Sequence, residues 1–197
     1  MENVRCFVAI ELESDITAAL GTLLARLRGA PAARLARWVA PQSIHLTLQF
    51  LGQVPAGRVA ELEQALARAC REAAPFEIAV GGLGCFPSPS RPRVIWVGVE
   101  EPTGALQRLQ VAVERELARL GFRPEARAFT PHLTLARVRD PVSSRERAEL
   151  GAWIRSQAAG ALGRMRVGQV CLMRSELRPA GAVYTRLAAA PLRPAEG

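Results

Sequence analysis

The tetrapeptide His-Leu-Thr-Leu occurs twice in this chain, starting at His45 and at His132, and these are the only two histidines in the sequence. In a β-strand, side chains two positions apart point to the same face. Each copy would therefore place an imidazole and a hydroxyl on one face of a strand and two leucines on the other. The repetition predicts a fold of two related halves whose polar strand faces meet at one site.

The repeated motif also narrows the chemistry. Two imidazoles, with Thr47 and Thr134 beside them, could surround a small anion and provide an acid, a base and hydroxyl donors for a phosphate. A single histidine on a half-apolar strand is more often structural, but the repeated context favours function. Binding of zinc by the two histidines is another alternative to a catalytic role. We expect no metal, because two histidines supply two ligands and the four cysteines show no close C-x-x-C spacing.

Length and composition indicate a globular protein. The chain has 197 residues, of which 49% are hydrophobic, enough for a sizeable core in one large domain or two small lobes. The opening residues lack the basic stretch and long apolar run of a secretory signal, and no apolar stretch reaches the length of a membrane span. Four scattered cysteines do not suggest a disulfide framework. We expect a cytoplasmic protein without membrane association and, since no protein partner is evident, a monomer.

The net charge of +8 comes from arginine alone, because the sequence contains no lysine. This excludes a Walker A lysine, a Schiff-base lysine and the lysine that an ATP-dependent nucleic-acid ligase adenylates. Solvated helix faces account for most of the arginine excess. A basic total nevertheless suits a polyanionic partner.

Hydrophobic periodicity indicates that the same order of strands and helices occurs twice along the chain. In the first half, a strand over residues 4–12 and an amphipathic helix precede the first motif strand at residues 44–51. In the second half, a strand at residues 94–99 and a helix at residues 106–120 precede the second motif strand at residues 131–137. The other predicted elements are a helix at 55–74, strands at 76–80, 167–173 and 183–187, a loop at 81–92, and a helix after a capping box of Ser143 and Glu146.

This order predicts a single α+β domain over residues 1–197 with two pseudo-twofold lobes. Each lobe would be a small antiparallel sheet with helices on its outer face. The two motif leucines of each strand would point to the helices, and the histidines and threonines would line an active-site cleft between the lobes.

The motifs themselves resemble the signatures of a known family. Residues 45–52, His-Leu-Thr-Leu-Gln-Phe-Leu-Gly, and residues 131–137, Pro-His-Leu-Thr-Leu-Ala-Arg, are similar in order and spacing to those of the two-histidine phosphoesterase superfamily. Within it they look most like the LigT-like RNA 2′,3′-cyclic phosphodiesterases, historically called 2′-5′ RNA ligases. Residues 5–10, 93–99 and 175–184 are also similar to that family, so the resemblance covers nearly the whole chain.

The resemblance implies metal-independent hydrolysis of RNA 2′,3′-cyclic phosphate ends to a 2′-phosphomonoester without a cofactor, and weak 2′-5′ RNA ligation as the reverse reaction. It implies that His45 protonates the leaving oxygen and His132 accepts a proton from water, although the residues alone do not distinguish these roles. Thr47 and Thr134 would hold the phosphate oxygens. Arg137 would bind the phosphate or transition state. Strict alternation places Arg137 on the leucine side, so this role requires a bulge or strand end, and a surface ion pair is the alternative.

Further substrate contacts are predicted outside the motifs. Phe7 is a candidate for stacking on a terminal nucleobase, with a core position as the alternative. Arg91, Arg93 and Arg127 could guide the RNA backbone or simply be solvated. Two other functions remain open: hydrolysis of a small cyclic phosphate such as ADP-ribose 1″,2″-cyclic phosphate, and RNA binding without catalysis.

Overall fold

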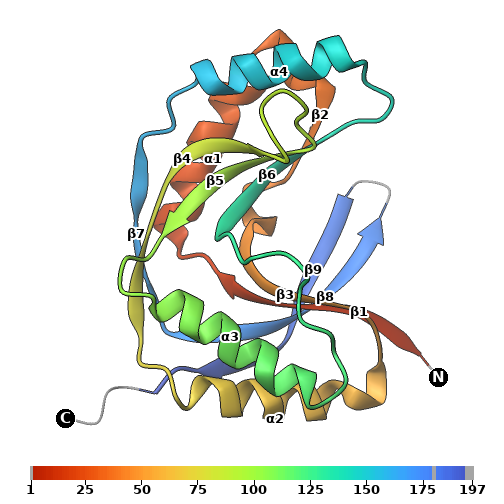
Figure 1. Ribbon diagram of the computed structural model, residues 1–197, viewed down its shortest axis with the longest axis vertical. Helices are drawn as coiled ribbons and strands as arrows, with labels where there is room; N and C mark the ends of the chain where they lie inside the picture. Colours follow the sequence, from red (N-terminus) through yellow and green to blue (C-terminus); the bar gives the residue numbers. More distant parts are fainter. Residues whose placement is uncertain (1, 179–180, 194–197) are drawn as a thin grey trace.

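The computed structural model describes residues 2–178 and 181–193 (Figure 1). Residues 179 and 180, inside the segment 175–184 that carries part of the family resemblance, lie outside the described residues. The strands are β1 (Asn3–Glu11), β2 (Ala36–Trp38), β3 (His45–Pro55), β4 (Phe76–Phe86), β5 (Val94–Glu100), β6 (His132–Val138), β7 (Ala161–Val167), β8 (Gln169–Arg178) and β9 (Gly181–Pro191). The α-helices are α1 (Ser14–Arg28), α2 (Val59–Cys70), α3 (Ala105–Ala118) and α4 (Ser144–Ser156).

Within the described residues, nine strands form one antiparallel sheet in the order β7-β4-β5-β6-β3-β1-β8-β9, with β2 paired to β6. The sheet curls into a C, with α1 and α4 outside the half that holds β4 to β7 and α2 and α3 outside the other half (Figure 1). The predicted α+β class with two helix-covered halves is confirmed. The two halves are joined into one sheet, because Leu46 of β3 pairs with Leu133 of β6.

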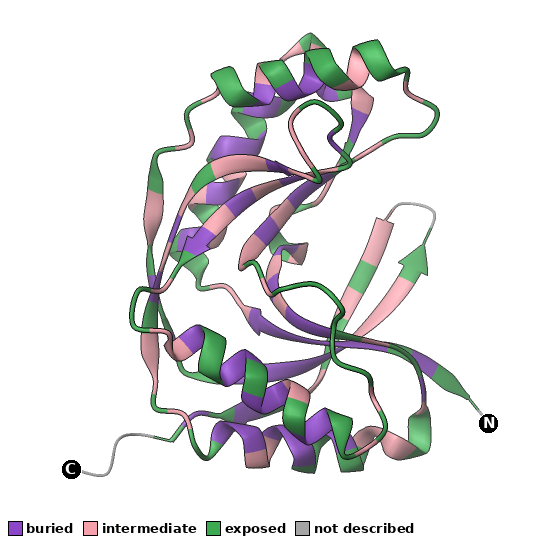
Figure 2. Ribbon diagram, in the orientation of Figure 1, coloured by how far each residue is buried: buried purple, intermediate pink, exposed green. Residues whose placement is uncertain are grey.

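The core lies between the leucine side of the sheet and the helices. The four motif leucines are at most 2% exposed and belong to one cluster with the apolar stripes of α1, α2 and α3. In Figure 2 the buried residues follow the helix faces that meet the sheet. A one-residue slip in register would turn these leucines to the other face, so their burial fixes which face carries the histidines. No helix in the described part of the chain is long and apolar enough to cross a membrane.

Several predicted boundaries are wrong at glycines. β3 continues past Gly52 to Pro55, and β4 continues through Gly81 and Gly82 to Phe86, where a loop was predicted. Gly82 has a φ of 70° at a register shift between β4 and β5, so this glycine forms a bulge inside a strand rather than a strand end. The short strand β2 and most of β7 were also missed. The capping box of Ser143 and Glu146 is present at the start of α4.

Candidate active site

The contact between β3 and β6 brings the two motifs together. Leu46 and Leu133 are directly opposed and both point into the core. The residues on either side of each leucine therefore share the opposite, concave face of the sheet. Directly opposed residues in an antiparallel pair have Cα atoms about 4.5–5.5 Å apart, so these side chains are close neighbours. The His-Thr cluster defined in this way consists of His45, Thr47, His132 and Thr134, all partly buried.

Both histidine rings are oriented in the same way. Nδ1 of His45 lies 3.0 Å from the carbonyl oxygen of Ser43, and Nδ1 of His132 lies 2.7 Å from that of Thr130. A carbonyl oxygen can only accept, so each Nδ1 carries the proton and donates it to this bond. Nε2 is therefore the atom of each ring that can exchange a proton with a ligand.

His45 sits in an aromatic cluster. Phe7 stacks on its ring at a centroid distance of 4.5 Å, and Tyr184 meets it edge-on at 4.9 Å. Burial lowers the pKa of His45 to about 4, while the Ser43 carbonyl and the negative charge of Glu11 act in the opposite direction. The imidazole is therefore neutral at pH 7 in the free protein. An anion bound beside it would raise the pKa.

Glu11 lies directly opposite His45 in the β1–β3 pair, and its negative charge acts on the imidazole. Its Oε2 accepts hydrogen bonds from Nη1 of Arg186 at 2.9 Å and from Sγ of Cys171 at 3.3 Å. These two donors hold the carboxylate in place. They also offset part of the negative charge that His45 experiences.

A tryptophan supports the other half of the site. Trp96 of β5 lies opposite Thr134, with its ring centroid 6.4 Å from that of His132. On the next strand, Gly84 lies opposite Trp96, and a Cβ at this glycine would be 2.2 Å from Cζ2 of the indole. Because the ring occupies the space of a missing side chain, Gly84 is required for its position.

A bulge brings Arg137 to the concave face. Thr134 is opposite Trp96 and Ala136 is opposite Ile95, so Leu135 is an extra residue on β6. This extra residue shifts the alternation by one and places Arg137 on the same face as Thr134. The Arg137 side chain is exposed, and within residues 2–178 and 181–193 it forms none of the ion pairs expected of the surface alternative. The bulge that a substrate-binding role for Arg137 requires is therefore present in β6.

Phe7 takes the core position that the sequence analysis gave as the alternative to stacking on a nucleobase. Its side chain is 2% exposed and is covered by His45 and Tyr184, so it lacks a free face for a nucleobase and supports the His45 ring instead. Sequence reasoning missed Phe50, which is 54% exposed. An extra residue in β3 between Thr47 and Gln49 turns Phe50 to the concave face, opposite Phe7. The available signal was that Phe50 follows His45 by the same interval as Arg137 follows His132.

The remaining predictions concern cations and metals. Arg91, Arg93 and Arg127 are all exposed, with no ion pair among the residues that the structure describes. In the same part of the chain, no group of three or more His, Cys, Asp or Glu side chains could hold a metal ion. The four cysteines are free and buried.

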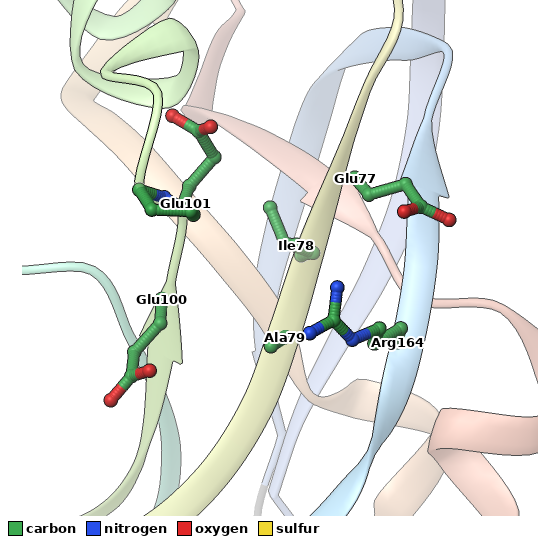
Figure 3. A pocket seen from close by; sticks show the side chains of 7 residues that line it. Glu77, Ile78, Ala79, Glu100, Glu101 and Arg164 are labelled. Carbon is green, nitrogen blue, oxygen red and sulfur yellow. The ribbon is translucent and has the colours of Figure 1, made fainter.

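A cavity of about 410 Å³ lies at the end of β5 that is farther from Arg137, and it contains neither histidine. Figure 3 shows Glu100 and Glu101 directed away from each other and the Arg164 guanidinium beside Ala79. With Glu77, three carboxylates and one guanidinium line this cavity. This balance of charge disfavours a phosphate, which the His-Thr cluster is better suited to bind.

Comparison with known proteins identifies the family. The sequence profile of the 2′-5′ RNA ligase superfamily matches residues 6–179, which include both motifs. The chain belongs to this superfamily. It is 38% identical over 183 residues to an RNA 2′,3′-cyclic phosphodiesterase of Methanothermobacter thermautotrophicus, covering 93% of this chain and 96% of the relative. It is 35% identical over 184 residues to a protein of the same name from Archaeoglobus fulgidus, covering 93% and 98%.

Solved structures agree with this membership of the 2′-5′ RNA ligase superfamily. A crystal structure of a Thermus thermophilus protein matches with a TM-score of 0.79 and 29% identity, covering 98% of this chain and 100% of the other. The structure of E. coli LigT complexed with 3′-AMP matches with a TM-score of 0.77 and 27% identity, covering 97% and 99%. The predicted family resemblance is confirmed.

Proposed function

We propose that this member of the 2′-5′ RNA ligase superfamily hydrolyses RNA 2′,3′-cyclic phosphate ends to a 2′-phosphomonoester and a free 3′-hydroxyl. The observation that carries the proposal is the His-Thr cluster, in which two imidazoles with free Nε2 atoms and two hydroxyls share one face. Relatives named RNA 2′,3′-cyclic phosphodiesterase support the substrate class.

The reaction uses one proton transfer at each histidine. His132 Nε2 accepts a proton from water, the water oxygen attacks phosphorus, and the bond from phosphorus to O3′ breaks. His45 donates its Nε2 proton to O3′, so the phosphate stays on O2′. Positioned proton transfer of this kind contributes about 10²–10⁴-fold in rate. Thr47 and Thr134 donate hydrogen bonds to the non-bridging oxygens, which gain negative charge in the transition state.

The donor role of His45 depends on the substrate. Its pKa of about 4 leaves it neutral at pH 7 in the free protein, mainly because it is buried. A phosphate anion placed within a few ångströms favours the charged imidazolium, and the charge of Glu11 acts in the same direction. Substrate binding therefore favours protonation of His45 at Nε2, and His45 later donates this proton to the leaving oxygen.

The same site explains the choice of an RNA end. Phe50 offers an exposed ring on which a nucleobase of any sequence can stack, and Arg137 supplies a positive charge next to the cluster. Two imidazoles perform the acid and base steps, so no metal or cofactor is required. The free cysteines fit a protein that works in the cytoplasm. Reverse 2′-5′ ligation would be weak and ATP-independent, because water outcompetes a ribose hydroxyl.

The test is an assay of purified protein in excess EDTA against two substrates: an oligonucleotide with a 2′,3′-cyclic phosphate end and ADP-ribose 1″,2″-cyclic phosphate. We expect hydrolysis of the oligonucleotide, a higher kcat/KM for it, and a 2′-phosphate signal in phosphorus NMR. A predominant 3′-phosphate would contradict the orientation and the assignment of acid and base. Activity that disappears in EDTA and returns with a metal would contradict metal independence, and a preference for the ADP-ribose compound would favour the small-molecule alternative.

A further inference from the structure

Two arginines of the concave face lie directly opposite each other. Arg37 of β2 is paired with Arg137 of β6. Opposed side chains in an antiparallel pair point to the same face from Cα atoms about 5 Å apart, so Arg37 shares the face of Arg137 and Thr134. Like charges in this position destabilise a sheet.

Nothing in the described part of the chain neutralises this pair. Both side chains are exposed, and neither forms an ion pair or a side-chain hydrogen bond within residues 2–178 and 181–193. On its other side Arg137 faces Val94, and the described strands place only β6 beside β2. Arg186, by contrast, is bonded to Glu11 on the same concave face. The fold therefore places two unpaired guanidinium groups side by side.

The position of Arg37 is fixed by its neighbours. Trp38 donates from Nε1 to the carbonyl of Ala33 at 2.9 Å, and Val39 donates from its backbone N–H to Leu135 at 2.8 Å. Ala36, on the other side of Arg37, is 2% exposed and packs in the core under α4. The arginine pair is thus held together by the strand pairing, which favours a preorganised site for an anion.

We propose that Arg37 and Arg137 together bind one phosphodiester of the RNA backbone, the one on the 5′ side of the terminal nucleotide. The inference rests on the proposed function, in which the cyclic phosphate of that nucleotide occupies the His-Thr cluster. Arg137 follows Thr134 by three residues that include a bulge, which is roughly 7–10 Å along β6 and comparable to one nucleotide step. Two guanidinium groups can each donate to a non-bridging oxygen of the same phosphate.

The distribution of charge along the sheet supports an RNA chain that runs from the His-Thr cluster toward Arg37 and Arg137. Val94 of β5 lies opposite Arg137, Gly98 lies opposite His132, and Glu100 lies farther in the same direction. The arginine pair and the glutamate-lined cavity are therefore at opposite ends of the site. A polyanion entering the site is attracted to the arginine end and repelled from the other.

The test compares a substrate that has this phosphodiester with one that lacks it. The substrates are the dinucleotide ApA ending in a 2′,3′-cyclic phosphate, and adenosine 2′,3′-cyclic phosphate. We expect Arg37→Gln to lower the ratio of their kcat/KM values, dinucleotide over nucleoside, by about 10-fold, as expected for a charged hydrogen bond. Arg137→Gln should lower the ratio at least as much. An unchanged ratio in R37Q would overturn the inference.

Two controls separate the inference from other causes. Arg71→Gln removes the same charge at the end of α2, outside the curled sheet, and should leave the ratio unchanged (Figure 1). A ratio that falls equally in R71Q would mean a general effect of net charge and would contradict a specific role for the arginine pair. R37Q should also raise the melting temperature in low-salt buffer without phosphate, because it removes repulsion between like charges. A lowered melting temperature would indicate a structural role for Arg37 and count against the inference.

Measured affinities for product-like compounds can test the arginine pair even if the protein hydrolyses neither substrate. If the wild-type protein hydrolyses neither substrate, the proposed function is wrong, and calorimetric affinities for ApA with a 2′-phosphate and for adenosine 2′-phosphate replace the rates. Loss of the dinucleotide's advantage in R37Q would support the arginine pair as a phosphodiester site. Equal affinities of the wild-type protein for both compounds would refute it.

Discussion

Lowering the pH from 7 to 4 should destabilise the free protein through His45. Burial lowers its pKa from 6.5 to about 4, so between these values the unfolded chain binds a proton that the folded protein does not. Each pH unit in this window costs about 1.4 kcal/mol, which gives a total loss of about 3 kcal/mol. The contribution is fully present above pH 6.5, is lost as the pH falls, and levels off below the folded-state pKa.

The assay compares the wild-type protein with His45→Asn by urea unfolding at several pH values. Carboxylates that titrate near pH 4 are common to both proteins, so the difference between the two curves isolates His45. The wild type should lose about 3 kcal/mol more than H45N between pH 7 and pH 4. Because the chain has two histidines, NMR of the imidazole signals measures the pKa directly, and His132→Asn assigns them.

Ligand binding provides the complementary measurement. Saturation with adenosine 2′-phosphate should raise the pKa of His45, because the anion favours the imidazolium. The reasoning would be refuted if His45 titrated at or above 6.5 in the free protein, or if its pKa did not move when the ligand bound.

Three further predictions concern the same site. His45→Ala or His132→Ala should lower kcat by about 10²–10⁴-fold with the fold retained by circular dichroism, and Thr47→Ala or Thr134→Ala should cost less; equal losses for all four would contradict the roles assigned here. Arg186→Gln should raise the pKa of His45 in NMR titrations, because Glu11 then keeps its full negative charge, and an unchanged pKa would exclude this coupling. Gly84→Ala should destabilise the protein by about 1–3 kcal/mol in urea unfolding and lower kcat, because a Cβ there displaces Trp96 beside His132, and wild-type stability would show that the indole moves at no cost.

The sequence predicted the parts of this fold that depend on hydrophobic periodicity. The buried stripe of α1, Ile16, Leu20, Leu23, Leu24 and Leu27, follows the predicted helical period. The alternation in the two motifs placed their leucines in the core, and the repeat predicted that the histidines would meet. These features were accessible because each is set by residues a few positions apart in the chain.

The features that were missed depend on the pairing of distant strands. The local sequence predicts a strand end at Gly52 and a loop at Gly82. The neighbouring strands β1 and β5 continue past these glycines and keep them in the sheet. The three residues of β2 are too few for a periodic signal, and they form a strand because β6 offers an open edge there. Burial of Phe7 also follows from tertiary packing, because Tyr184 comes from the other end of the chain.

The two bulges place chemically different side chains at equivalent positions of a nearly symmetric site. Each shifts the alternation after a threonine, so that Phe50 in one half and Arg137 in the other are turned to the concave face in equivalent positions. The paired histidines and threonines are nearly symmetric and cannot by themselves choose which ribose oxygen leaves. We expect an exposed aromatic ring at one of these positions and a cation at the other to give a bound nucleotide one preferred orientation. We therefore expect the regiochemistry to depend on the second residue after each bulge, Phe50 in one half and Arg137 in the other, where the two halves of the repeat differ in chemistry.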